Sequence, residues 1–291
     1  MTDMNYDGIG ITIENYVAVV EIQRGPNNFF DTQMIKDLAD AFGKMEASKE
    51  VRAVVLCSEG KHFCAGNNFG SASGNEERAD RKVEAGNPLY AAAVRLFDTN
   101  IPVVAAVQGA AVGGGFGLAV MPDFRVVCPE ARFTANFVKL GFHPGFGLTH
   151  TLARLIGQQK AHMLFLTGRR ITGEEAYEMG LADVLTDKEN LRSEAIKLAQ
   201  EIAENAPLAV ASVRATMRAG LADAVKAQTD HEFVEQHRLQ QTADHREGVK
   251  AVAERRPGNF IAEYSLSGCR YSQRAGHPAR CGSPHRPFHP A

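Results

Sequence analysis

The chain has 291 residues, of which 44% are hydrophobic and 23% charged, and its formal net charge is −2. These values are typical of a soluble globular protein and leave no basic excess for binding a nucleic acid. No apolar run approaches the ~20 residues that span a bilayer, and the first ten residues lack the features of a secretory signal. We therefore expect a cytoplasmic protein without a nucleic-acid or membrane partner.

Apolar runs alternate with helical periodicity along the first two thirds of the chain. The runs expected to form strands are 10–15, 17–24, 52–58, 101–109, 124–130 and 181–185. Helices are expected at 31–46 and 88–99, and after the capping-box sequences TGEE at 172–175 and TDKE at 186–189. Near-continuous apolar strands alternating with helices predict an α/β fold whose sheet is buried on both faces.

The composition changes twice toward the C-terminus. After Pro207 the pattern is helical without a convincing strand, so we divide the chain into a core at 1–204 and a helical region at 205–264. Residues 265–291 hold four of the 32 basic residues and none of the 34 acidic ones, with few apolar side chains. We expect this tail to be disordered, and we prefer a solvated extension to a His/Cys metal site there.

The five cysteines show no spacing typical of a disulfide framework. Cys57 and Cys128 lie in strand-like apolar runs, where we expect small buried side chains. His62 and Cys64 form an H-x-C pair, but no second pair follows at the spacing of a zinc site. The sequence therefore predicts no metal site.

A glycine-rich segment, AVGGGFGLAVMPDFR at 111–125, precedes an expected helix start. It fails the G-x-G-x-x-G dinucleotide pattern because position 118 is leucine. The chain also has no P-loop and no G-x-S-x-G elbow with a serine nucleophile. Taken alone, the three consecutive glycines favour a flexible bulge over a site.

A second glycine turn, GKHFCAGNNF at 60–69, also follows a strand-like run. Two turns of this kind are able to aim backbone N–H groups at the same oxygen atom. Such a pair of donors is an oxyanion hole, which stabilises charge on a carbonyl oxygen without any side chain. The sequence alone therefore makes acyl transfer or enolate chemistry a candidate.

Four segments together resemble the crotonase, or enoyl-CoA hydratase/isomerase, superfamily. They are 60–69, 101–127, 166–185 and 245–256, in the order and spacing of that superfamily, within a resemblance that spans about 8–262. The resemblance implies a crotonase-type ββα spiral core with a C-terminal helical trimerisation region. It also implies an acyl-CoA thioester as substrate, with coenzyme A part of the substrate and no separate cofactor.

The resemblance carries site roles to individual positions. It assigns the oxyanion-hole N–H groups to Ala65 and Gly114, the latter at a helix N-terminus whose dipole favours negative charge. Substrate-binding roles along the coenzyme A and acyl path fall on further residues, namely Phe29, Asn67, Asn68, Phe69, Gly113 and Phe137.

The chain departs from the superfamily at its acidic residues. The two glutamate positions of the hydratases are Gly117 and Phe137 here, and the acid of related isomerases and hydrolases falls at Gly145. His143, beside a proline turn, is our candidate for moving a proton, with a backbone-bonded turn histidine as the alternative. His62 and Cys64 are weaker candidates for the same role.

Two functional classes remain open from the sequence. The first is an enzyme on acyl-CoA thioesters, a lyase, isomerase or hydrolase, in fatty-acid or aromatic-acid metabolism. The second is a non-catalytic acyl-CoA binder or a structural homologue. We prefer the enzyme, as a homotrimer or a dimer of trimers. Four phenylalanines favour a bulky apolar acyl group unless they belong to the core: Phe116, Phe137, Phe142 and Phe146.

Overall fold

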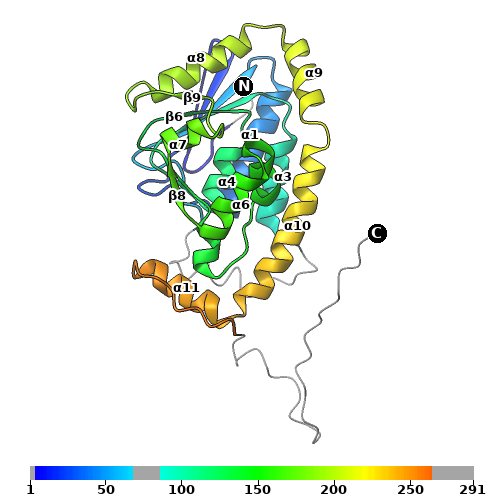
Figure 1. Ribbon diagram of the computed structural model, residues 1–291. Helices are drawn as coiled ribbons and strands as arrows, with labels where there is room; N and C mark the ends of the chain where they lie inside the picture. Colours follow the sequence, from blue (N-terminus) through cyan, green and yellow to red (C-terminus); the bar gives the residue numbers. More distant parts are fainter. Residues whose placement is uncertain (1–3, 68–85, 264–291) are drawn as a thin grey trace, which may run out of the picture.

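The computed structural model describes residues 4–67 and 86–263, shown in Figure 1. In these residues the larger sheet has six strands in the order β1-β2-β3-β4-β6-β9. The strands are β1 Ile9–Glu14, β2 Val17–Ile22, β3 Ala53–Ser58, β4 Val103–Val107, β6 Phe124–Val127 and β9 Val184–Leu185. β1 and β2 are antiparallel, and the later neighbouring pairs are parallel. Each strand overlaps a run predicted from the sequence, which confirms the α/β assignment.

Helices cover both faces of this sheet because its central strands have no polar face. All six residues of β3 are buried. Val54 and Leu56 pack with α1 (Thr32–Ala47) and α3 (Pro88–Asp98). Ala53 and Val55 pack against α8 (Leu191–Ala203) on the opposite face. The prediction of a sheet buried on both faces is confirmed.

A second sheet carries the elements around the glycine-rich segment. Within the described residues it has three strands in the order β5-β7-β8, with β5 parallel to β7 and β8 antiparallel to it. The strands are β5 Ala110–Val112, β7 Arg132–Thr134 and β8 Arg170–Thr172. The neighbouring helical elements are α4 Gly114–Val120, η2 Asn136–Leu140, α5 Leu148–Ile156, α6 Gln158–Thr167 and α7 Gly173–Glu178. The sequence did not predict this sheet.

Helix caps decide several element boundaries. Asp31 accepts a hydrogen bond from the Met34 N–H and starts α1. Thr172 and Glu175 form both bonds of a capping box, as the sequence predicted for α7. The second predicted capping box, at 186–189, is wrong. The Asp187 carboxylate accepts from the Asn190 N–H instead, and α8 begins after Asn190.

The C-terminal part of the described chain is helical, as predicted. Its helices are α9 Pro207–Met217, α10 Leu221–Gln240 and α11 Ala243–Ala253. α10 packs along α3 and α5, and Figure 1 shows α11 at the end of the molecule away from α8. None of the described helices has the length and apolar character needed to cross a membrane. The division of the chain at residue 204 stays a prediction, and 265–291 lie outside the described residues.

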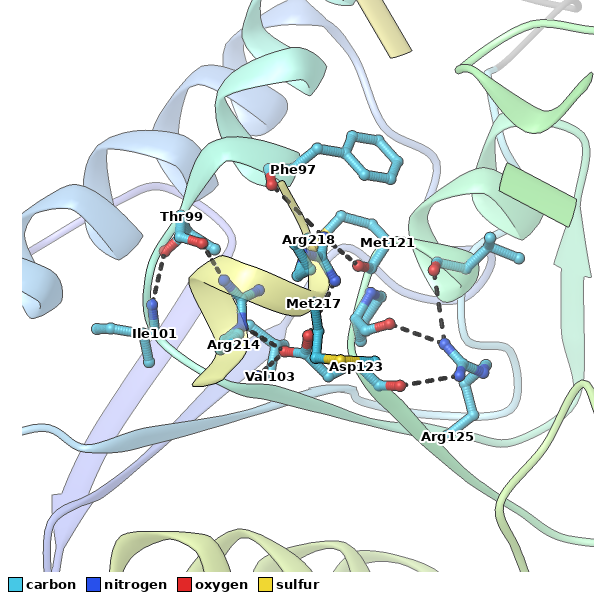
Figure 2. Close-up of polar contacts among 12 residues, drawn as sticks. Phe97, Thr99, Ile101, Val103, Met121, Asp123, Arg125, Arg214, Met217 and Arg218 are labelled. Carbon is cyan, nitrogen blue, oxygen red and sulfur yellow. Dashed lines mark hydrogen bonds and ion pairs between the residues drawn. The ribbon is translucent and has the colours of Figure 1, made fainter. Parts of the chain in front are cut away.

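A largely buried carboxylate ties α9 to the sheet (Figure 2). Asp123 accepts hydrogen bonds from Arg214 Nε and Arg218 Nη1, each at 2.9 Å, and from the Val103 N–H at 2.8 Å. The three charged side chains are 14%, 8% and 14% exposed, so their interactions are poorly screened by solvent. Arg125, which is 2% exposed, donates to backbone carbonyls of the same turn. The network fixes the end of α9, and the helix that follows, α10, contributes Phe233, Gln236 and Gln240 to the cavity described next.

Candidate active site

A cavity of about 390 Å³ lies between the two glycine turns and the C-terminal helices. This size falls within the range of small-molecule sites. Its aromatic lining consists of Phe29, Phe30, Phe137, Phe142, Phe146, Phe233 and Tyr90. Polar lining residues include Asn67, Asn136 and Gln236, and none of the described lining residues is acidic. The cavity therefore offers a ligand hydrogen bonds from neutral groups and aromatic surface.

Three chain segments converge at one end of this cavity. The backbone at residues 63–65 runs beside β5, with the Cys64 N–H donating to the Ala110 carbonyl and the Val112 N–H donating to the Cys64 carbonyl. The segment 27–30 lies on the side of this backbone opposite β5. Gly115 permits this approach, because a Cβ there would overlap the Cys64 carbonyl. The close packing brings the two predicted turns together.

The structure corrects the predicted pair of oxyanion donors. Ala65 lines the cavity, but its N–H donates to the Asn27 carbonyl at 3.0 Å and is not available to a ligand. Gly66 adopts a φ of +82°, and the Phe30 N–H bonds its carbonyl. Phe30 and Asn67 form a parallel β-bridge, and in this pairing the Asn67 N–H faces away from Phe30.

Two backbone N–H groups remain as candidate donors to a ligand oxygen. The N–H groups of Asn67 and Gly114 donate to no acceptor within the described part of the chain. Both residues line the cavity, and a Cβ added at Gly66 would lie 3.6 Å from the Gly114 nitrogen. Backbone donors that lack an internal acceptor are expensive to bury unless a ligand or water accepts from them. Two such N–H groups at one cavity are what the predicted oxyanion hole requires.

An aromatic ring fills the space beside Gly117, the first empty glutamate position. A Cβ at Gly117 would lie 2.7 Å from Cβ and Cδ1 of Phe146, well inside van der Waals contact. Phe146 is 1% exposed and packs against Phe30, with ring centroids 5.7 Å apart. Its φ of +64° is uncommon for a residue with a side chain. A carboxylate side chain at position 117 therefore has no room in this packing.

A neutral hydrogen-bonded pair fills the space beside Gly145. A Cβ there would overlap the Tyr90 hydroxyl and the Gln236 amide nitrogen. Tyr90 Oη donates to Gln236 Oε1 at 2.8 Å, and Gln236 Nε2 donates to the His143 and Pro144 carbonyls. At the remaining position, the Phe137 side chain lines the cavity. Apolar or neutral groups thus occupy all three acidic positions of the family pattern.

The structure does not place His143 among the described residues that line the cavity. Its Nδ1 lies 2.9 Å from the Pro144 carbonyl, and its ring meets His231 edge-on. Burial lowers the pKa of His143, so the ring is neutral at pH 7. This is the arrangement of the backbone-bonded turn histidine. A proton-transfer role for His143 has no support from these contacts.

The weaker candidates His62 and Cys64 have structural partners. His62 Nδ1 accepts from the Ala110 N–H at 3.1 Å, which fixes it as an unprotonated nitrogen. Burial raises the pKa of the Cys64 thiol to about 12, so the reactive thiolate does not form at neutral pH. Both side chains support the first glycine turn.

A buried carboxylate lies behind the cavity wall. Glu232 of α10 accepts from the N–H groups of Gly147 and Thr149, at 2.8 and 3.2 Å, and from the Thr149 hydroxyl. These bonds satisfy the N-terminus of α5 and hold the turn that follows Phe146. Burial raises the pKa of Glu232 to about 7 despite these donors. Glu232 is not a described lining residue of the cavity.

Four of the predicted substrate-binding residues line the cavity. These are Phe29, Asn67, Gly113 and Phe137. Asn68 and Phe69 lie outside the described residues. Of the four phenylalanines named for the acyl pocket, Phe116 instead packs in the core against Phe133, with ring centroids 5.3 Å apart. Sequence reasoning missed Tyr90, Asn136 and Gln236, which carry no local motif.

A comparison with known protein families identifies the family to which the chain belongs. A family model described as enoyl-CoA hydratase/isomerase matches residues 12–263. The chain belongs to this family. The predicted membership of the crotonase superfamily is thereby confirmed, and the missing glutamates make the chain a divergent member.

Individual relatives agree with this membership. The chain is 34% identical over 221 residues to the short-chain-enoyl-CoA hydratase of Clostridium acetobutylicum, covering 75% of this chain and 84% of that protein. It is 32% identical over 253 residues to the putative enoyl-CoA hydratase/isomerase YngF of Bacillus subtilis, covering 86% and 96%. An enoyl-CoA hydratase/isomerase structure from Pseudoalteromonas atlantica T6c matches with a TM-score of 0.78 at 26% identity, covering 88% and 100%. The crotonase-type fold is confirmed.

Proposed function

We propose that this chain binds an acyl-CoA thioester in the 390 Å³ cavity and stabilises negative charge on the thioester oxygen. The donors are the backbone N–H groups of Asn67 and Gly114. One observation carries the proposal: Asn67 and Gly114 both line the cavity, and neither N–H group donates to an acceptor in the described chain. In such surroundings a hydrogen bond to a developing oxyanion is strong. Asn67 takes the place that the sequence analysis gave to Ala65.

The reaction belongs to the enolate or tetrahedral-intermediate chemistry that an oxyanion hole serves. Relatives named as enoyl-CoA hydratases favour a catalyst over a non-catalytic binder. Hydration of an enoyl thioester requires a base to deprotonate water and an acid to deliver a proton to the α carbon. Gly117 and Phe137 supply neither group. We therefore propose a lyase, isomerase or hydrolase that differs from a glutamate-dependent hydratase in its proton transfer.

Aromatic residues of the cavity support an apolar acyl group. The part of the cavity nearest the glycine turns is lined by aromatic side chains, namely Phe30, Phe137, Phe142 and Phe146. Phe29 also lines the cavity, which supports its predicted contact with the coenzyme A portion. The proposed substrate is an acyl-CoA with a compact, bulky acyl chain.

Exposed apolar side chains on α9 support the predicted self-association. Leu208, Val213 and Met217 are 86%, 64% and 68% exposed. Large apolar side chains exposed to this extent on one helix favour a protein contact surface. We propose that α9 packs against other copies of the chain in a trimer or hexamer, whose order sedimentation analysis determines. The cytoplasmic location stays a prediction.

Two substitutions at Gly114 test the oxyanion hole. Proline removes the N–H and is tolerated at the first position of a helix, whereas alanine keeps the N–H. Both add a Cβ that presses on the Phe30 ring, so alanine is the matched control. We expect acetoacetyl-CoA, whose enolate resembles the proposed intermediate, to bind Gly114→Pro about 10- to 100-fold more weakly than Gly114→Ala. Equal binding by two folded variants would refute the assignment.

A further inference from the structure

The carboxylate of Glu232 is bonded to a single turn of the chain. Its side chain is fully buried, and within the described residues every hydrogen bond that it accepts comes from Gly147 or Thr149. Burial of a carboxylate is costly unless such donors compensate it, so these bonds hold the turn to α10. The residue directly before Gly147 is Phe146, which lines the cavity.

Gln236 holds the other side of the same turn. It lies four residues after Glu232, on the same face of α10, and donates to the carbonyls of His143 and Pro144. Backbone groups before and after Phe146 are therefore bonded to one helix. Phe146 needs this support, because its φ of +64° is a conformation that residues with a side chain rarely adopt.

The Phe146 side chain belongs to the cavity wall beside the proposed oxyanion hole. A Cβ at Gly117, three residues after the donor Gly114, would meet this side chain. The Phe146 ring centroid lies 5.7 Å from that of Phe30, which lines the cavity, and 6.4 Å from that of Phe97, which is not a described lining residue. Phe146 therefore separates the cavity from the core, and the position of its ring sets the space open to an acyl group.

We propose that Glu232 determines the acyl-chain specificity of the cavity by holding the turn that positions Phe146, which restricts binding to compact acyl groups. This inference rests on the function proposed above. Glu232 is not a described lining residue, so it acts as a positioning residue. Without its bonds to Gly147 and Thr149, the turn and the ring gain freedom, and a longer acyl chain finds room. Each further methylene group that is buried tightens binding about fourfold.

The test measures the affinities of butyryl-CoA and octanoyl-CoA for the full chain by calorimetry. The readout is the ratio of the two dissociation constants, because partial unfolding weakens both affinities by the same factor and leaves their ratio unchanged. Glu232→Gln keeps the size of the side chain but replaces one acceptor oxygen by a donor. We expect this variant to shift the ratio toward octanoyl-CoA by about fourfold or more. An unchanged ratio in the folded variant overturns the inference.

Thr229→Val is the matched control on the same helix. Thr229 is 1% exposed, and its Cγ2 would lie 3.7 Å from a Cβ at Gly147, but its hydroxyl donates to the Lys226 carbonyl of its own helix. Thr229→Val should therefore keep the wild-type ratio. A shift as large as that of Glu232→Gln would contradict the inference, because the hydrogen bonds of Glu232 would then not be its cause.

Variants at the turn and at the ring locate the effect. Thr149→Val removes the hydroxyl that donates to Glu232, and Thr149→Ser keeps it, so only the valine variant should shift the ratio. This pair tests the inference if Glu232→Gln does not fold. In a Phe146→Ala background Glu232→Gln should add no further shift, and full additivity contradicts action through the ring. Failure of the wild-type chain to bind either thioester refutes the proposed function itself, whereas binding with a ratio that neither Glu232→Gln nor Thr149→Val shifts refutes the role of Glu232 alone.

Discussion

Gly117→Ala tests whether the first empty glutamate position is closed by Phe146. The added Cβ would lie 2.7 Å from two Phe146 atoms, so the ring or the helix must move by about 0.7 Å to restore ordinary contact. Phe146 cannot move freely, because it is 1% exposed and its φ of +64° is held by the following turn. Overpacking of this kind costs about 1–3 kcal/mol.

Helix propensity acts in the opposite direction. Alanine is favoured over glycine inside a helix by about 1 kcal/mol, so the net loss of stability in Gly117→Ala should be about 0–2 kcal/mol. Gly43→Ala in α1 is the matched control, since its new Cβ meets nothing within 4 Å. That variant should gain up to about 1 kcal/mol.

Urea unfolding of both variants gives the comparison. A cycle with Phe146→Ala adds a second readout, because the smaller residue leaves space for the new methyl group. The two substitutions should then be less than additive by about 1 kcal/mol or more. If Gly117→Ala is as stable as Gly43→Ala, the position is open, and its lack of a carboxylate is not a consequence of packing.

Two further predictions concern buried charges. Asp123→Ala leaves Arg214 and Arg218 without their carboxylate. The free energy of unfolding, measured by denaturant titration, should therefore fall by about 3–5 kcal/mol. A loss below about 1 kcal/mol would show that the network is not stabilising. Glu232, with a folded pKa raised to about 7 from 4.5, stabilises the fold when protonated and loses that contribution as pH rises. Between pH 5 and pH 8, wild-type protein should therefore lose about 2–3 kcal/mol relative to Glu232→Gln, and parallel pH curves of the two proteins would contradict the shift.

The sheet was predictable because its signal is local. A run such as 52–58, apolar at nearly every position, identifies a strand buried on both faces without knowledge of its neighbours. The strands β5, β7 and β8 have three residues each, too few to express a pattern. The sequence TDKE at 186–189 shows the opposite error, since a local motif was present but Asp187 bonded to Asn190 instead.

The part of the site that is built from backbone groups was predictable from the sequence. The glycine triplet and the turn at 60–69 were identified as one anion site because both follow strand-like runs. Which N–H faces the cavity depends on the φ of Gly66, and this torsion angle has no signature that separates Ala65 from Asn67. The pairing of Tyr90 with Gln236 depends on how α3 and α10 pack, so the local sequence around either residue does not predict it.

Crotonyl-CoA hydration by the purified wild-type protein, measured beside acetoacetyl-CoA binding, tests the proposed function most directly. The oxyanion donors at Asn67 and Gly114 predict that acetoacetyl-CoA binds. The loss of both acid–base groups, at Gly117 and Phe137, predicts hydration slower than that of a glutamate-dependent hydratase by about 10³-fold or more. Binding with slow hydration supports an oxyanion hole that works without the carboxylates. Turnover at the level of such a hydratase would contradict it, because a group other than a carboxylate would then be transferring protons as efficiently as the two missing glutamates.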